Sequence, residues 1–153
     1  MKNKELLENV KHFTKARPFS IHKTEIGADS TNALYVHYHP EMEFIYLDEG
    51  SMTFYVEGKQ YNMKEGDALF IPPALVHNAV KNTGVPCRHY AVVFSEEWLF
   101  MENTFERNIY NEIIYPYRYE CVCMLGRNNQ ADMDTLLPVS YTHLRAHETE
   151  ADL

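Results

Sequence analysis

The stretch LYVHYHPEMEFIYLDEG, residues 34–50, combines strand-like alternation with an unusual set of polar side chains. His37 and His39 lie two residues apart, and Glu43 follows His39 by four. Successive side chains of a strand point to opposite faces, so the two imidazoles are expected to share one face. A turn at the intervening Pro-Glu pair would bring Glu43 back beside them on an antiparallel neighbour. The stretch therefore predicts a polar cluster inside a β-structure.

The same alternation extends on both sides of this stretch, and glycine-containing turns interrupt it at short intervals. We expect eight strands, over residues 19–25, 33–39, 42–47, 52–56, 59–63, 68–71, 77–80 and 88–94. With 153 residues, of which 45% are hydrophobic, the chain can form one compact core. The pattern predicts a mainly β domain, either a sandwich or a small barrel.

Two motifs in this region resemble those of the cupin family. The first, HxH, three residues, E, six residues and G, is matched without a spacing error by His37, His39, Glu43 and Gly50. The second is matched by Gly66, Pro72 and His77, although Ala74 replaces its second glycine and Lys81 its asparagine. The resemblance implies a single cupin barrel (double-stranded β-helix, or jelly roll) over residues 19–94. A short N-terminal helix and a C-terminal helical segment are expected to flank it.

The resemblance also implies a metal or ligand site made of His37, His39, Glu43 and His77. Imidazole and carboxylate ligands together suit a divalent transition metal such as Mn, Fe, Ni or Zn. The alternative is that the four side chains line a polar pocket and bond to one another or to water, without a metal. Tyr35 shares the face of the histidines if the alternation is regular, so it is a further candidate ligand-binding residue.

Among cupins, residues 37–79 look most like the N-terminal ligand-binding and dimerisation domain of AraC-type transcriptional regulators. This resemblance implies a domain that senses a small-molecule effector, with a sugar as one candidate, and a homodimer in the full-length protein. No segment resembles the helix-turn-helix DNA-binding domain of that family. The rival hypothesis is a small metal-dependent cupin enzyme, such as a dioxygenase or isomerase.

The segments that flank the barrel have other patterns. Residues 1–18 are expected to form an N-terminal helix or arm, because apolar positions recur with helical spacing over residues 3–14. Residues 95–137 look like the truncated start of a helical linker and dimerisation region, with helices over 95–101, within 105–119 and from about Asn129. Residues 138–153 resemble translated adapter sequence, and we expect a non-native tail. His12, His22 and His89 are expected to be solvated or capping residues.

Charge and targeting signals exclude several classes of function. With 14 Lys and Arg against 22 Asp and Glu, the formal net charge is −8, which opposes direct binding of this segment to DNA. No signal peptide or apolar run long enough to span a membrane is present. The three cysteines do not form a disulfide framework, so we expect a cytoplasmic protein without membrane association.

Overall fold

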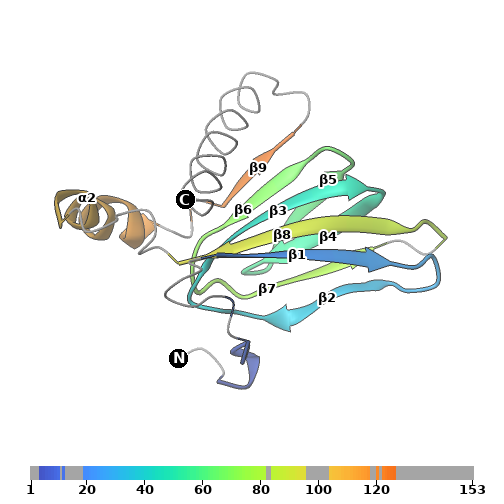
Figure 1. Cartoon of the computed structure of the whole chain (residues 1–153), viewed down its shortest axis with the longest axis horizontal. Helices are drawn as coiled ribbons and strands as arrows, with labels where there is room; N and C mark the ends of the chain where they lie inside the picture. Colours follow the sequence, from blue (N-terminus) through green and yellow to red (C-terminus); the bar gives the residue numbers. More distant parts are fainter. Residues whose placement is uncertain are drawn as a thin grey trace, which may run out of the picture.

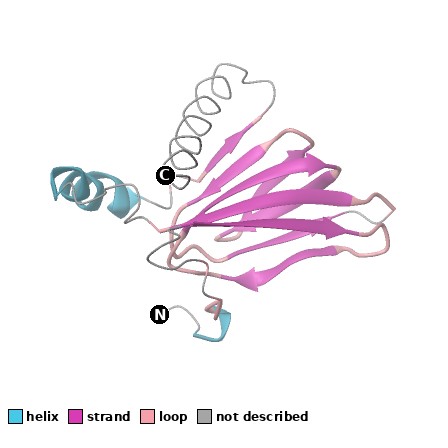
Figure 2. Cartoon of the chain, in the orientation of Figure 1, coloured by secondary structure: helices cyan, strands magenta, loops and turns pink. Residues whose placement is uncertain are grey.

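The computed structural model describes residues 4–10, 12, 19–81, 84–95, 104–117, 120 and 122–126. Two antiparallel sheets form the barrel, and Figures 1 and 2 show their strands running side by side. One sheet has the strand order β1-β8-β3-β6-β9, and the other has the order β2-β7-β4-β5. The strands are β1 (Phe19–Ile26), β2 (Asn32–His37), β3 (Met42–Glu49), β4 (Ser51–Val56), β5 (Lys59–Lys64), β6 (Ala68–Ile71), β7 (His77–Lys81), β8 (Cys87–Phe94) and β9 (Cys123–Leu125).

The core lies between the two sheets, where every second side chain of a strand is buried. In β8, burial alternates without interruption from Cys87 to Phe94. Phe54 of β4 and Leu47 of β3 are fully buried in this core. Burial of a large apolar side chain contributes about 1.5–3 kcal/mol, so this alternating face stabilises the two-sheet arrangement.

The sequence-based fold prediction is confirmed for the barrel. Each of the eight expected strands is present, with bounds that differ from the prediction by at most two residues. One strand was missed: β9 pairs antiparallel with β6, and Cys123 lies opposite Phe70. This strand has only three residues, too few for a period-two pattern to be recognised.

Strand β2 departs from regular alternation. Leu34 pairs with Ala79 and His37 pairs with His77, so three steps along β2 correspond to two steps along β7. This irregularity is a β-bulge, which inserts one extra residue into one strand of a pair. Leu34 and His37 therefore both face inward, whereas the intervening Tyr35 and Val36 are exposed.

The helix expected over residues 3–14 is wrong for the part that the structure describes. Only a short 3-10 helix, η1 (Lys4–Leu6), is present, and Leu7 then forms a parallel bridge to Tyr38. The Tyr38 amide donates to Leu6 O and the Glu8 amide donates to Tyr38 O, each over 2.9 Å. These bonds to the barrel satisfy backbone groups that a helix would have paired internally. We call the described residues 4–10 and 12 the arm.

Helical structure follows the barrel, as predicted within residues 105–119. It consists of α2 (Thr104–Ile109), a turn of π-helix η2 (Tyr110–Ile114) and the 3-10 helix η3 (Tyr115–Tyr117). Buried Tyr110 packs with Met42 of β3, which joins this segment to the barrel. Ser95 is not helical, and the rest of the helix expected over 95–101, the one from Asn129 and the tail 138–153 lie outside the described residues. No helix in the described ranges has the length and apolar character needed to cross a membrane.

Candidate metal centre

Three histidines from two adjacent segments of one sheet meet inside the barrel. His37 ends β2 and His77 begins β7, and the register places them directly opposite each other. His39 follows β2 after one residue. One ring nitrogen from each of the three lies within 4.8 Å of the other two, the one such group found among the described residues. His39 and His77 are only 3% and 1% exposed, so the cluster lies in the interior.

Glu43 approaches this cluster from β3, in the opposite sheet. Its Oε2 atom lies 3.1 Å from His77 Nε2 and 3.5 Å from His39 Nε2. The carboxylate is 5% exposed. The structure thus brings together all four residues that the two cupin motifs indicated, with Glu43 against two of the three histidines.

Backbone carbonyls orient two of the imidazoles. His37 Nδ1 donates to Tyr35 O over 2.8 Å, and His77 Nδ1 donates to Leu75 O over 2.9 Å. A hydrogen bond at one ring nitrogen fixes the tautomer and leaves the other nitrogen as a metal ligand. The Nε2 atoms of His37 and His77 are therefore the nitrogens available to an ion.

Several polar atoms of the cluster are buried without an aligned hydrogen bond. They include Glu43 Oε2, His77 Nε2, His39 Nδ1 and Glu41 Oε2; the last two lie 3.4 Å apart. Buried polar atoms without partners carry a free-energy cost of about 1–3 kcal/mol each. Imidazole and carboxylate donors in this arrangement fit a divalent ion of the Mn, Fe, Ni or Zn type, which would satisfy Glu43 Oε2 and His77 Nε2. When bound, such an ion would supply Lewis acidity and open positions for a ligand.

The charges within the cluster are interdependent. Burial alone would raise the pKa of Glu43, but contacts with His39 and His77 outweigh burial and hold its pKa well below the usual range. For His39, burial favours the neutral ring, yet the nearby carboxylates, Glu43 first, raise its pKa. Burial and the neighbouring His77 lower the pKa of His37. Without an ion, the site therefore favours a His39 imidazolium paired with the Glu43 carboxylate, beside a neutral His37.

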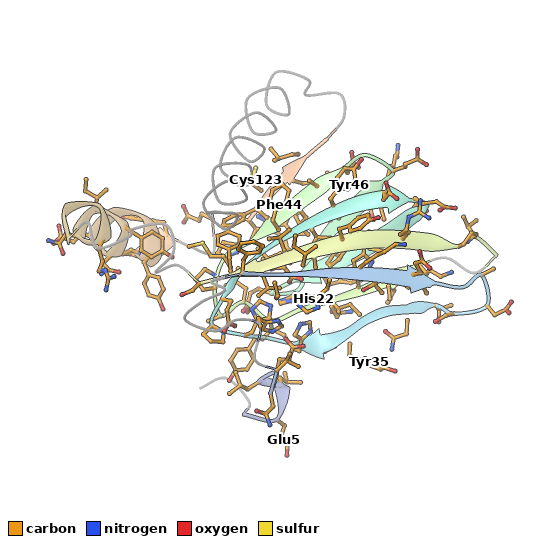
Figure 3. All side chains as sticks on the ribbon, viewed as in Figure 1. Glu5, His22, Tyr35, Phe44, Tyr46 and Cys123 are labelled. Carbon is orange, nitrogen blue, oxygen red and sulfur yellow. The ribbon has the colours of Figure 1, made fainter. Side chains whose placement is uncertain are left out.

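Tyr35 does not join the cluster. Its side chain is 79% exposed on β2, and Figure 3 labels it at the outer side of that strand. The expectation that it faces inward assumed uninterrupted alternation between Tyr35 and His37, and the β-bulge breaks this alternation. Only the Tyr35 carbonyl contributes, as the acceptor for His37.

The two departures from the second motif have visible structural consequences. Ala74 adopts a φ of 61°, a conformation that costs a residue with a Cβ about 1–2 kcal/mol and explains the usual glycine. Its amide donates to His39 O over 2.8 Å, so this strained turn holds a site residue. Lys81 is buried, and its Nζ donates to Val85 O over 2.8 Å. The lysine thus bonds to a loop on the barrel and does not reach the cluster.

Sequence reasoning missed a set of side chains next to the cluster. His12 is 8% exposed, and its ring lies 5.3 Å from that of His39. His12 Nε2 donates to Glu8 Oε2 over 2.9 Å, and His12 Nδ1 lies 3.4 Å from His22 Nε2. His89 is also buried, and burial lowers its pKa. The solvated roles expected for His12 and His89 are therefore wrong, and no local pattern could have paired residues of the arm with those of the barrel.

A separate pocket of about 320 Å³ opens beside the turn between β4 and β5. Its lining includes Val56, Tyr61, Leu75 and Val122, and none of the four cluster residues. Leu75 connects the pocket with the histidine cluster, because its carbonyl accepts the hydrogen bond from His77.

With this geometry established, the chain can be compared with known proteins. Residues 24–93 match the family model described as the cupin domain. The barrel has the jelly-roll fold of that family. The strands that the structure describes form two antiparallel sheets in the jelly-roll arrangement that the sequence predicted, with β9 as an unpredicted addition.

Known proteins that are similar to this chain include a regulator and an enzyme. An uncharacterized HTH-type transcriptional regulator of Bacillus subtilis, YdeC, is 25% identical over 123 residues, which cover 78% of this chain and 40% of the regulator. The chain thus spans less than half the length of that relative. A cupin protein from Bacteroides fragilis is 15% identical, with a TM-score of 0.47 over 52% of this chain and 67% of its own. The polyketide cyclase RemF from Streptomyces resistomycificus is 29% identical, with a TM-score of 0.44 over 51% of this chain and 55% of its own.

Proposed function

We propose that this chain is the effector-sensing and dimerisation part of an AraC-type transcriptional regulator. The supporting observation is the extent of the similarity to the Bacillus regulator. It covers 78% of this chain, whereas the cupin match ends at residue 93. The likeness therefore includes residues outside the barrel, where an enzyme and a regulator built on the same fold would differ.

In this proposal, His37, His39, Glu43 and His77 hold a divalent transition metal, and the effector attaches at its open positions. The cluster suits this role because its donor atoms are buried and two rings are fixed by backbone carbonyls. The effector is a small molecule with an anionic or hydroxyl oxygen that can bind such an ion, a class that includes sugars. Effector binding would shift the population of domain arrangements in the homodimer, which requires different affinities for the two states.

The first test is binding. The purified chain is loaded with Ni²⁺ or Zn²⁺, and sugars, hydroxy acids and carboxylates are screened for a rise in melting temperature. We expect one chemical class to stabilise the chain, and we expect His77→Ala to abolish both tight metal binding and this stabilisation. Asn78→Ala is the matched control, because Asn78 is adjacent in β7 but its side chain lies on the opposite face.

The second test separates a regulator from the rival metal-dependent enzyme. The stabilising compound is incubated with the metal-loaded chain and recovered, while transcripts are compared in cells that carry the intact gene, a deletion or His77→Ala. A regulator returns the compound unchanged and makes a set of transcripts respond to it only when the site is intact. Conversion of many equivalents of the compound, with no transcript dependent on the gene, would favour the enzyme.

A further inference from the structure

The arm is attached to the barrel next to the histidine cluster. Its two backbone hydrogen bonds, from Tyr38 to Leu6 O and from Glu8 to Tyr38 O, both use Tyr38. Tyr38 is the residue between His37 and His39. The arm therefore lies against the segment that carries two of the three clustered imidazoles.

This attachment places a second carboxylate at the cluster. Glu8 Oε2 lies 3.8 Å from His37 Nε2, the nitrogen left available by the bond from His37 Nδ1 to Tyr35 O. The Glu8 side chain is 28% exposed and that of His37 is 15% exposed. Glu8 thus lies on the more open side of the cluster, whereas Glu43 closes the buried side.

Glu8 is held in this position through His12, which connects it to the barrel. His12 Nε2 donates to Glu8 Oε2 over 2.9 Å, and His12 in turn contacts His22 of β1. Ser20 Oγ lies 2.9 Å from His22 Nε2, so a chain of polar contacts runs from β1 through the arm to His37. Figure 3 shows His22 on the side of the barrel where the arm, marked by Glu5, lies.

The position of Glu8 suits it to balance the charge of a bound metal ion. A divalent ion held by three neutral imidazoles and the Glu43 carboxylate would retain one uncompensated positive charge, and buried charge is costly unless it is paired. The carboxylate of Glu8 could balance this charge through the 3.8 Å gap, directly or through an ion-bound water. From these contacts we infer that Glu8 is an additional acidic residue of the metal centre, so that metal binding and docking of the arm stabilise each other. The inference rests on the metal-binding part of the proposed function.

Metal affinity gives the first readout. The affinity for Ni²⁺ is measured by competition with a colorimetric chelator for the wild-type chain, Glu8→Gln, Glu8→Asp and Glu5→Gln. Loss of an outer carboxylate of a metal site reduces affinity by about 10- to 100-fold, so we expect at least a tenfold loss for Glu8→Gln. We expect a smaller loss for Glu8→Asp, which keeps the charge on a shorter side chain. Glu5→Gln changes an exposed acid of the same arm and should leave the affinity unchanged.

Hydrogen exchange gives a readout that a purely structural role would not change. By reciprocal linkage, Ni²⁺ should slow exchange at the amides of Glu8 and Tyr38 in the wild-type chain and in Glu5→Gln, but not in Glu8→Gln. Equal Ni²⁺ affinity of the wild type and Glu8→Gln would overturn the inference. Failure of the wild-type chain to bind Ni²⁺ would also overturn it. That failure would not by itself contradict the regulator assignment, which the transcript experiment tests without added metal.

Discussion

At the scale of single residues, a proton and the proposed metal ion would compete for the imidazole of His39. Contacts with Glu43 and other carboxylates raise the pKa of His39, so below that pKa the ion-free site contains an imidazolium–carboxylate pair. A ring nitrogen must be unprotonated to bind a metal. The proton on His39 that stabilises the ion-free site must therefore leave before His39 can bind a metal ion.

The ion-free chain should consequently depend on pH in a defined direction. The pKa of His39 is raised, so its contribution to folding is complete below the unfolded value of about 6.5 and is lost as pH rises through the folded value. The pKa of Glu43 is lowered, so its contribution is present above about 4.3 and is lost as pH falls. The pair should stabilise the chain most between these two limits.

Urea unfolding of the wild-type chain and Glu43→Gln, with chelator present, measures this effect. Near pH 5.5 we expect the variant to lose about 2 kcal/mol of unfolding free energy, the usual cost of leaving a buried polar group without its partner. The difference should shrink at high pH, where His39 is neutral in both chains. Glu65→Gln, in an exposed turn, is the control; an equal difference at both pH values would contradict the pairing of His39 with Glu43.

At the scale of elements, two turn glycines of the barrel differ in the space available for a larger side chain. Gly50 and Gly58 both have positive φ angles, 88° and 79°. A Cβ at Gly50 would lie 2.6 Å from Pro86 O, whereas a Cβ at Gly58 would have no neighbour within 4 Å. The glycine of the first cupin motif is therefore required for space as well as for conformation.

We predict unequal costs for alanine at these two turns. Gly58→Ala should lose about 1–2 kcal/mol of unfolding free energy, the cost of a left-handed conformation for a residue with a Cβ. Gly50→Ala should lose clearly more, because the Pro86 carbonyl is backbone and can move only if the chain just before β8 moves. Thermal and urea unfolding of the two variants provide the comparison, and equal losses would show that the close approach of Pro86 does not matter.

Some elements of the fold could be predicted from the sequence, and others could not. Strands β1 to β8 and the four cluster residues were predictable, because alternation and motif spacing are local and glycine marks the turns. The positions of Tyr35 and the arm were not. The bulge that turns Tyr35 outward depends on the pairing of β2 with β7, and the helical spacing of the arm was overridden by its hydrogen bonds to Tyr38. In both cases a distant segment of the chain determined the conformation.

At the scale of the whole molecule, charge limits the partners of this chain. Its net charge of −8 repels phosphate, and counterion release from clustered Lys and Arg supplies most non-specific affinity for DNA. The chain also covers only 40% of its regulator relative. In the proposed regulator, the sensing part is therefore expected to act on DNA only through other segments.

We predict that this 153-residue chain alone gives no sequence-selective gel shift with the DNA that flanks its own gene. The assay is repeated at low and physiological salt with non-specific competitor, with and without the metal and the stabilising compound. A selective shift that weakens steeply with salt would contradict the assignment of this chain to sensing and dimerisation.

Strand β6 has one further consequence for the molecule. On one side it pairs with β3, where Ile71 lies opposite Glu43, and on the other side it pairs with β9, where Phe70 lies opposite Cys123. A strand cannot slip by one residue without turning its side chains to the wrong faces, so β6 fixes the relative positions of its two neighbours. The Glu43 carboxylate and the point where the chain leaves the sheet after Leu125 are thus held in one register. We expect a signal that passes between them to travel as a bend or twist of the sheet, because a one-residue slip of β6 would turn its side chains to the wrong faces.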